Sequence, residues 1–472
     1  MGGLSVAFGT VVSALEANQQ AINVTANNVG NANTPGYTLE TVTFQQTSPI
    51  TAGGLQIGTG VTVSAVTSQR SLILNQAIDQ QQQTLSAATS RQAGLTSVEN
   101  IFNQVATSTS SSGSGGIGGA LTNFFSSLSS LAASPSQSST RTGFLSAAQA
   151  LAASFNSAAS QLSSTTTSLN QQVGTTVQQI NGLTATLASL NQQITQTSPN
   201  GDAGALEDQR QQALSQLSQL VAVNQIQTQN NQITLTTANG TVLVAGNQSF
   251  ALTASPSATT AGVQAVYSGT TDISASIQGG SLGGTLQNLY QDIPAAQSQI
   301  DTLAHSVATS INSIQQSGTD QNGSPTATTP LFNIPTGVSG SAAAISVAIT
   351  DPTKIAAAAS GNGSADGSNA QAMANVANQA VAGGSTPANF YAAFLGTLGS
   401  NVQSLQTTVS AVTTSLSQLT TQQGSLSGVS QDQEASNLVT YQRAYQAASQ
   451  TFTILNNLMT AALNLGVETA MS

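Results

Sequence analysis

Apolar residues recur in alternating steps of four and three at both ends of the chain. Near the start, the positions with this spacing are Leu4, Phe8, Val11, Leu15, Asn18, Ile22, Thr25 and Val29. Near the end, they are Leu438, Tyr441, Tyr445, Ala448, Phe452, Leu455, Met459 and Ala462. This is the heptad spacing of a left-handed coiled coil, whose apolar face must pack against another surface. We therefore expect the terminal helices to pack against each other or against neighbouring copies, with the rest of the chain inserted between them.

Helical spacing of apolar residues also fills much of the interior of the chain. It predicts helices over residues 71–105, 121–133, 141–196, 205–220, 282–316 and about 395–426, and a new helix that starts near Ser430. The Ser- and Gly-rich residues 107–119 predict a loop between the first two of these helices.

Two interior blocks lack helical spacing. Residues 221–280 change to a period of two, and Asn239-Gly240 is typical of a tight β-hairpin turn. Residues 318–367 carry clusters of Gly, Pro, Ser and Asn, which are typical of loops and short strands. Residues 38–66, just after the first helix, likewise predict short extended segments broken by turns.

Together these patterns predict a mainly α-helical, elongated multi-domain protein with inserted β domains and long antiparallel helices. In this fold, the N- and C-terminal helices pair as a coiled coil. We expect a terminal assembly domain of residues 1–70 and 428–472, and a helical bundle domain of residues 71–221, 282–317 and 368–427. The remaining residues, 222–281 and 318–367, would form an outer β-rich domain that lies farthest from the termini.

Composition narrows the function classes. Only 5% of the 472 residues are charged and the net charge is -10, so no basic surface is available for nucleic acid or for an anionic membrane. Cysteine is absent, which excludes disulfides and thiolate chemistry. The first basic residue is Arg70 and no stretch of about 18 apolar residues occurs, so we expect neither a cleavable signal peptide nor membrane insertion.

No residue pattern supports catalysis or a bound cofactor or metal. His305, the only histidine, falls off the apolar face of its predicted helix and is interpreted as a solvated side chain. Glu207 and Asp208 are adjacent, so they point to different sides of a helix and favour its first turn, although Asp208 can still pair with Arg210 or a neighbouring helix. We therefore expect no enzyme activity.

Residues 26–37 read Ala-Asn-Asn-Val-Gly-Asn-Ala-Asn-Thr-Pro-Gly-Tyr. This segment resembles the signature shared by the axial proteins of the bacterial flagellum, namely its rod, hook and hook–filament junction subunits. The residues that carry the motif are Asn28, Asn31, Asn33, Thr34, Pro35, Gly36 and Tyr37. Here Asn33 is expected to end the first helix in a left-handed conformation and Pro35 to prevent its continuation.

The C-terminal segment is similar to one branch of that family. Residues 427–438 and the Tyr-Gln-Arg-Ala-Tyr-Gln-Ala-Ala run of 441–448 most closely resemble the end of the hook-associated protein 1 family. Residues 206–220 and the Gly-Gly-Ser-Leu-Gly-Gly run of 279–284 also resemble that family. Gln433 stands where the family commonly has an acidic residue, and the chain is short for the family.

The resemblance implies a structural subunit of the hook–filament junction, exported by the flagellar type III route and located outside the cell. It implies as partners further copies of the chain in a ring, the hook subunit, a second junction protein and an export chaperone that binds residues 430–465. The expected assembly interface comprises Leu4, Phe8, Val11, Leu15, Ile22, Val29, Leu438, Tyr441, Tyr445, Phe452, Leu455 and Met459. Open alternatives are an internal coiled coil of a monomeric protein, a hook or rod subunit, a secreted adhesin or effector, and a wall hydrolase.

Overall fold

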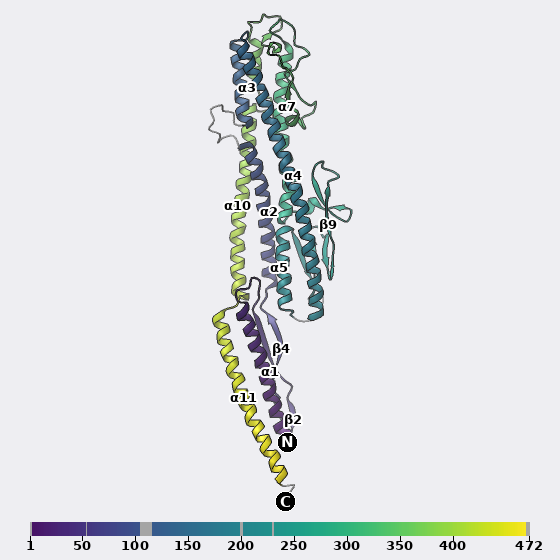
Figure 1. Ribbon diagram of the computed structural model, residues 1–472, viewed down its shortest axis with the longest axis vertical. Helices are drawn as coiled ribbons and strands as arrows, with labels where there is room; N and C mark the ends of the chain where they lie inside the picture. The colour runs from purple at the N-terminus through teal and green to yellow at the C-terminus, as the bar shows by residue number, and fades with distance from the viewer. Residues whose placement is uncertain (1, 53, 104–115, 199–201, 229–230, 469–472) are drawn as a thin grey trace.

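The computed structural model describes residues 2–52, 54–103, 116–198, 202–228 and 231–468, which form a long, narrow column of helices (Figure 1). Both ends of the chain lie at one pole of the column. The segment around residues 318–367 lies toward the opposite pole, which we call the distal pole. The predicted elongated, mainly helical architecture with small sheets is confirmed.

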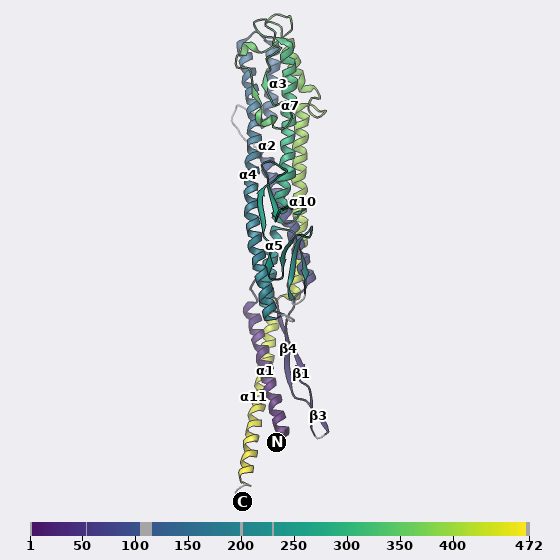
Figure 2. The same cartoon turned by 90° about the vertical axis from the view of Figure 1, so that its right-hand side faces the viewer.

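The terminal helices form their own layer at the lower pole. Helix α1 (Gly2–Asn31) and helix α11 (Gln431–Glu468) run antiparallel and side by side in both views (Figures 1 and 2). An antiparallel ladder of β1 (Glu40–Gln46) and β4 (Val61–Ser68) lies against α1. The small hairpin of β2 (Ile50–Ala52) and β3 (Leu55–Ile57) extends this ladder at its far end (Figure 2).

Above this layer, long and short helices run along the axis of the column. They are α2 (Leu72–Asn103), α3 (Gly116–Ala133), α4 (Ser138–Thr197), α5 (Ala205–Leu220), α6 (Gly280–Gln287), α7 (Ile293–Ser317) and α10 (Pro387–Ser427). A π-helical turn, η3 (Asn288–Asp292), joins α6 to α7 within the helix predicted as a single unit. Helices α2 and α10 pack antiparallel, and the side chain of Gln423 donates a hydrogen bond of 2.7 Å to Asn75.

The predicted loop of residues 107–119 is corrected in part. Its residues 107–115 lie outside the described residues, but residues 116–119 already belong to α3. Ile117 and Ala120 are buried there, and this apolar contact extends the helix by a turn despite the local glycines.

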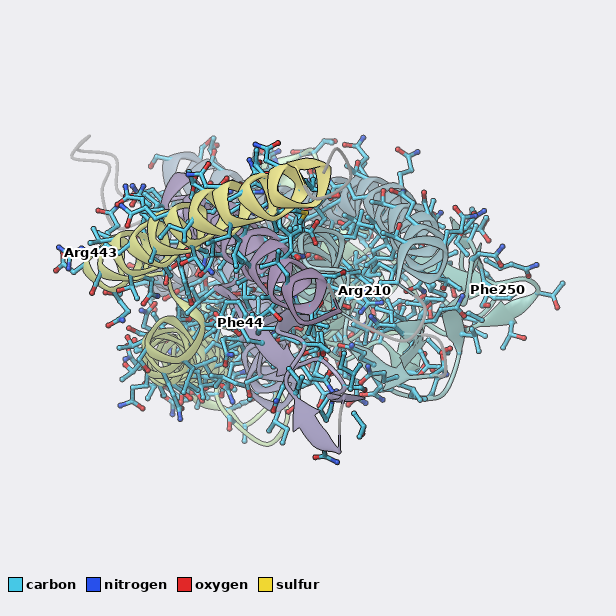
Figure 3. All side chains as sticks on the ribbon, turned by 90° about the horizontal axis from the view of Figure 1, so that it is seen from below. Phe44, Arg210, Phe250 and Arg443 are labelled. Carbon is cyan, nitrogen blue, oxygen red and sulfur yellow. The ribbon has the colours of Figure 1, made fainter. Side chains whose placement is uncertain are left out.

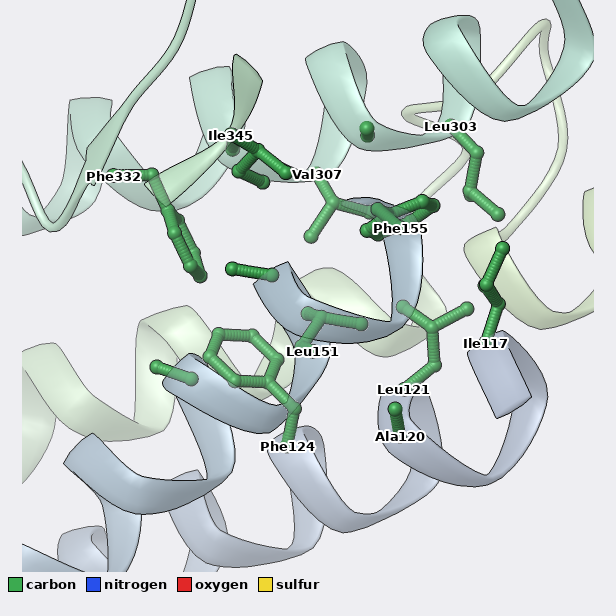
Figure 4. Close-up of a cluster of buried hydrophobic side chains, with 14 of the residues drawn as sticks. Ile117, Ala120, Leu121, Phe124, Leu151, Phe155, Leu303, Val307, Phe332 and Ile345 are labelled. Atoms are coloured by element: carbon green, nitrogen blue, oxygen red, sulfur yellow. The ribbon is translucent and has the colours of Figure 1, made fainter. Parts of the chain in front are cut away.

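The helical column has two hydrophobic cores. The distal core combines α3, the first half of α4, α7 and the start of α10 with residues 331–382, and Figure 4 shows part of it. Phe124 and Phe332 meet in this core with ring centroids 5.8 Å apart. The lower core combines the second half of α4 with α5, α6 and the strands between residues 223 and 273.

The lower core is closed by two small antiparallel sheets. One has the strand order β5 (Val223–Gln227), β6 (Ile233–Thr237), β7 (Val242–Ala245) and β8 (Gln248–Ser249), and the other contains β9 (Leu252–Pro256), β10 (Gln264–Ser268) and β11 (Thr271–Asp272). Gly240 at φ +85° turns β6 into β7, so the predicted Asn239-Gly240 hairpin is confirmed. The short helix η2 (Ser274–Ser276) follows.

The distal segment holds only short elements. They are β12 (Gly318–Thr319), β13 (Phe332–Asn333), α8 (Ser341–Ala344), β14 (Ser346–Val347), η4 (Pro352–Lys354), β15 (Ala358–Ala359), α9 (Ser368–Asn375) and η5 (Val376–Asn378). Strands β12 and β15 form one antiparallel pair, and β13 and β14 form another.

The two strand-rich segments occupy different places along the column. Residues 222–281 lie beside α4 and α5 in its lower half, because Leu235, Leu243 and Val244 bury their side chains in the lower core (Figure 1). Residues 318–367 bury theirs in the distal core. The prediction that both segments lie farthest from the termini is therefore wrong for residues 222–281, and the two segments share no common core within the described part of the chain.

Candidate assembly interface

The predicted C-terminal seam is the face that α11 turns toward α1. From Leu438 to Met459, each seam position of α11 is half-buried, whereas every intervening residue is exposed. Phe452 meets Phe8 of α1 with ring centroids 4.7 Å apart. At the upper end, Tyr441 also lies 6.1 Å from the ring of Phe44 in β1. The structure thus brings Leu438, Tyr441, Tyr445, Phe452, Leu455 and Met459 onto one stripe, as predicted.

The N-terminal seam is covered less evenly. Leu4, Phe8, Val11, Leu15 and Ile22 are half-buried, whereas Val29 is 39% exposed. The most buried positions of α1 are the small or polar residues Ala17, Ala21, Thr25 and Asn28. Helix α1 is packed between α11 and the β1–β4 ladder, so its buried face includes the heptad position Thr25 together with Ala17, Ala21 and Asn28, which lie outside the heptad. Val29 is therefore not covered within the single chain, where Asn28 takes the inward position, and its predicted place in an interface with neighbouring copies stays a prediction.

Asn28 connects the motif to the C-terminal helix. Its Nδ2 donates hydrogen bonds of 2.8 Å to Glu434 Oε2 and 2.8 Å to the Glu40 carbonyl. Its Oδ1 accepts hydrogen bonds from the Tyr37 hydroxyl at 2.7 Å and from the Glu40 amide at 3.1 Å. All the hydrogen-bonding capacity of this buried amide is thus used within the chain. Asn437 also donates a hydrogen bond of 2.9 Å to Glu434.

The remaining motif residues form the turn that ends α1. Asn31 is the last residue of the helix, and both its carbonyl and its side-chain oxygen accept hydrogen bonds from Thr34, at 2.9 and 3.1 Å. The left-handed position of the turn is Gly36, at φ +84°. Asn33 is not among the described non-glycine residues with positive φ, so its predicted left-handed conformation is wrong. Glycine fills that role at no steric cost, one residue after Pro35.

A cluster of charged groups joins the terminal layer to the helical column. The guanidinium of Arg70 pairs with Glu207, with Asp208 at 2.7 Å and with Asp202 at 3.7 Å, and these side chains are only 10–15% exposed. Asp208 also accepts hydrogen bonds from the Thr38 amide at 2.9 Å and the Thr38 hydroxyl at 2.7 Å. We call Thr38, Arg70, Asp202, Glu207 and Asp208 the joint cluster.

The joint cluster was only partly predictable. Asp208 does pair with another segment, but its partner is Arg70 and not Arg210. Arg210 instead donates hydrogen bonds to Asn191 and to the Asn231 carbonyl. The sequence offered one signal for these ion pairs, namely Arg70, the basic residue just before the first long interior helix. In a chain with so few charges, a cation that becomes buried needs an acidic partner.

Burial of the acidic groups shifts several pKa values at this joint. Burial, together with the nearby carboxylates Asp202 and Asp208, raises the pKa of Glu40. Burial and the nearby carboxylates, Glu40 first among them, raise the pKa of Tyr37. The pKa of Asp202 is lowered, because hydrogen bonds from Ser68 and Gly204 and the charge of Arg70 outweigh its burial. The region is therefore held by polar contacts that change with pH.

Other candidate chemistry is not assembled. His305 is half-buried, and its Nδ1 lies 3.2 Å from the Ser341 hydroxyl, so the expected solvated position is wrong. Among the described residues, no group of three or more His, Cys, Asp or Glu side chains is placed so that it could hold a metal ion. In the same part of the chain, no helix is both long enough and apolar enough to cross a membrane.

Three segments match known families. Residues 8–38 match the family described as "Flagella basal body rod protein", and residues 422–465 match "Flagellar basal body rod FlgEFG protein C-terminal". Residues 95–332, just over half of the chain, match "Flagellar hook-associated protein FlgK helical domain". The chain belongs to the flagellar hook-associated protein FlgK family.

Similarity to FlgK relatives extends over almost the whole chain. Flagellar hook-associated protein 1 of Salmonella typhimurium is 27% identical over 561 residues, which cover 98% of this chain and 100% of that relative. The proteins of the same name from Escherichia coli and Bacillus subtilis are 27% and 28% identical and cover 98% and 96% of this chain. The predicted resemblance to hook-associated protein 1 is thereby confirmed.

The fold is also that of a solved FlgK structure. The flagellar hook junction protein FlgK from Burkholderia pseudomallei matches with a TM-score of 0.66 and 20% identity, and the match covers 74% of this chain and all of that chain. At this identity, the likeness establishes the shared architecture of the FlgK fold.

Proposed function

We propose that this FlgK-family chain is a non-catalytic structural subunit that joins the hook of the bacterial flagellum to its filament. Copies of the chain form a ring outside the cell, and they contact each other through α1 and α11. The similarity over nearly the full length to proteins named flagellar hook-associated protein 1 supports this role.

One observation carries the assembly part of the proposal. Within the described chain, α11 packs mainly along α1, and this contact uses a single face of α11. Away from the seam, Ile454 and Leu458 are 60% and 53% exposed, and Leu463, which follows Met459 on the seam face, is 56% exposed. Large apolar side chains that stay exposed after a helix has buried its seam favour contact with a further protein surface. Neighbouring subunits around a ring would supply that surface.

The proposed partners follow from the same geometry and the family. Besides further copies of the chain, they are the hook subunit below the ring, a second junction protein above it, and an export chaperone that covers α11 before secretion by the flagellar type III route. We propose that α1 and α11 become fully ordered only on assembly, because one half-buried seam offsets little of the entropy of fixing two long helices.

A hook or rod subunit is the second candidate. The matches of residues 8–38 and 422–465 to rod protein families favour it, because these segments contain most of both terminal helices. The FlgK helical domain over residues 95–332 favours the junction role. A secreted adhesin or effector has no specific observation in its favour.

Deletion of the gene separates these candidates. A junction protein predicts complete hooks without filaments, and monomeric flagellin shed into the medium. A hook or rod subunit predicts absent or truncated hooks, and its copy number on isolated flagella would be in the hundreds. Normal filaments in the deletion strain would contradict the junction role. Electron microscopy of the deletion strain and the same strain carrying the intact gene gives the answer.

A further inference from the structure

A small cavity lies in the lower half of the column, between α2, α5 and β5. Its volume is about 110 Å³, and it is lined by one face of α2, one side of α5 and the start of β5. Asp79 is the single ionisable side chain among the described residues of this lining. The other lining side chains are amides, one hydroxyl and two aliphatic groups, so one carboxylate faces an otherwise neutral cavity.

The carboxylate of Asp79 is only half satisfied within the chain. Asp79 is 5% exposed, and its Oδ2 accepts a hydrogen bond of 3.0 Å from Gln211 Nε2. Its Oδ1 is buried and has no hydrogen-bond partner among the described residues. A buried carboxylate that lacks a donor or a cation carries a large desolvation penalty. Because Asp79 lines the cavity, a cation that enters it can reach this carboxylate.

No cation of the described chain compensates this charge. Asp79 takes part in none of the ion pairs of the described residues. Arg210, labelled in Figure 3, directly precedes Gln211 on α5. Its guanidinium donates hydrogen bonds to Asn191 of α4 and to the Asn231 carbonyl, so it is held on the side of α4 and the segment before β6. A counter-charge for Asp79 must therefore come from outside the described chain.

Neutral oxygen atoms surround the same cavity. Gln83 is 9% exposed, and its Nε2 donates hydrogen bonds of 3.1 Å to the Val223 carbonyl and 3.4 Å to Ser218 Oγ, which leaves Oε1 as its acceptor atom. Strand β5 is the edge of its sheet, and the Val223 carbonyl faces α2 instead of β6. Backbone groups of alternate residues in a strand point to the same side, so the carbonyl of Gln225 lies along this edge as well.

We infer that this cavity binds one alkali-metal cation, K⁺ or Na⁺, through the carboxylate of Asp79 and the neutral oxygens of Gln83 and β5. Hard cations prefer such oxygen ligands, and a single carboxylate balances a single positive charge. Sites for Ca²⁺ usually collect further carboxylates, which this lining does not offer. The cavity also leaves room for water molecules to complete the coordination. The ion would tie α2 and α5 to the edge strand β5, whatever the role of the whole chain.

Hydrogen exchange of the purified full-length chain tests the inference. Exchange is compared in KCl, NaCl and choline chloride at the same ionic strength of about 0.15 M. The measurements are made at pH 8, because burial raises the pKa of Asp79 to about 6 and the carboxylate must be charged. We expect the amides of residues 214–227 to exchange at least about fourfold more slowly in KCl or NaCl, which corresponds to a Kd of about 50 mM or tighter. Equal exchange in all three salts overturns the inference.

Three variants show whether the cation acts at this cavity. Asp79→Asn removes the charged ligand and should exchange equally in the three salts, and in choline chloride it should be better protected than the parent chain. Gln83→Met removes a neutral oxygen at similar length and should reduce the response to K⁺ and Na⁺. Asp432→Asn changes an exposed carboxylate on α11 and should keep the full response. A response that persists unchanged in Asp79→Asn places the ion elsewhere and overturns the site.

Two further measurements identify the ion. Protection by CaCl2 at the same ionic strength, without any protection by KCl or NaCl, overturns the assignment to an alkali-metal cation. Thallium NMR follows the ion directly, with Tl⁺ nitrate as the probe in place of K⁺. The Tl⁺ signal should shift in the presence of the parent chain, K⁺ should reverse the shift, and Asp79→Asn should abolish it. A Tl⁺ signal that is the same with the parent chain and with Asp79→Asn overturns the inference.

Discussion

The side-chain amide of Asn28 donates a hydrogen bond to the carboxylate of Glu434 at 2.8 Å, and these residues are 406 positions apart. Asn28 is 1% exposed and Glu434 is 4% exposed, so this contact between the two ends of the chain is shielded from water. It explains why the asparagine-rich motif after the first helix and the acidic start of the last helix belong together. A buried carboxylate that lacks a donor carries a large desolvation penalty.

Replacement of Asn28 by Asp should separate the terminal helices. The new carboxylate would face Glu434 and lose the Nδ2 donor, and we expect a loss of about 2–4 kcal/mol for the pairing of α1 with α11 at pH 7. Adding Glu434→Gln returns a donor opposite the new acceptor and should recover part of that loss. Hydrogen exchange of the α1 and α11 amides measures both effects. Unchanged protection in Asn28→Asp would contradict the role of this contact.

The joint cluster predicts a second destabilised variant. Arg70→Met removes the direct cationic partner of Asp202, Glu207 and Asp208, so we expect the joint to lose about 2–4 kcal/mol at neutral pH. The amides of Leu39 and Gln69, which donate hydrogen bonds to Ser427 and Leu39, should then exchange faster.

Arg443→Met is the matched control for Arg70→Met, because Arg443 has no ion pair within the described chain. It should change the free energy of unfolding by less than about 0.5 kcal/mol. Equal effects of the two variants on joint exchange would show that the cluster does not hold the joint.

The terminal seam predicts a specific loss of assembly. Phe452→Asp or Tyr445→Asp places a charge on the half-buried stripe of α11 and should abolish incorporation at hook ends, while the helical column stays folded. Asn457→Asp introduces the same group at an exposed position outside the stripe and should lower incorporation much less than Phe452→Asp. Immunolabelling of hook ends and circular dichroism of the purified chains make the comparison, and normal assembly of Phe452→Asp would reject the seam as an assembly surface.

A pair of helical glycines gives a prediction about packing. A Cβ at Gly284 would lie 2.2 Å from the Ala87 carbonyl oxygen, because α6 crosses α2 at close range. Gly284→Ala should therefore cost about 2–4 kcal/mol of stability. Gly182 lies within α4 with nothing within 4 Å of such a Cβ, so Gly182→Ala should stabilise the chain by about 0.5–1 kcal/mol. Opposite shifts of the melting temperature are the expected outcome, and shifts of the same sign contradict it.

Asp79 predicts stability that increases toward mild acid. It is 5% exposed, it accepts a hydrogen bond of 3.0 Å from Gln211, and burial raises its pKa to about 6. Because the folded pKa lies above the unfolded value, the folded state binds the proton more tightly. This contribution to stability therefore grows as the pH falls through about 6 and is complete below about 4.

Asp79→Asn should therefore stabilise the chain at pH 7 by about 1–3 kcal/mol and remove this part of the pH dependence. Asp366→Asn is a control whose effect on stability should depend on pH in the opposite direction. Hydrogen bonds from Ser368, Asn362 and the Ala359 amide lower the pKa of Asp366, so its contribution is present at neutral pH and is lost in acid. Denaturant unfolding from pH 2 to 8 distinguishes the two, because the Asp79 contribution changes between about pH 4 and 6 and the Asp366 contribution only below about pH 4. A pH profile that is identical in Asp79→Asn and the parent chain would contradict the burial argument.

Periodic apolar positions were enough to predict most helices. The bounds of α5 agree with the prediction, because Gly204 precedes its first residue and a strand begins soon after Leu220. The stripe on α11 was likewise predicted position by position as far as Met459, because α11 packs mainly against one neighbour. Local spacing determines which face is buried when only one surface covers it.

The sequence failed where several surfaces meet. Helix α1 is covered by α11 and by the β1–β4 ladder, so its heptad phase alone did not indicate that Asn28, named only for the motif, is buried while Val29 is exposed in the single chain. The joint cluster joins residues more than 130 positions apart, and no local pattern reports such a distance. The π-helical turn at Asn288–Asp292, where Asn288 donates a hydrogen bond to the Ser90 carbonyl of α2, could not be recognised from the apolar spacing.

Both terminal helices lie at the same pole. Residues 72–427 therefore leave the terminal layer at the joint cluster and return to it at the same place. Added length near the distal pole changes the reach of the column without any change in the contacts at its base. The exposed turn of residues 360–365, beside the end of α3, is thus a natural place to splice in a guest peptide and display it outward from a flagellum.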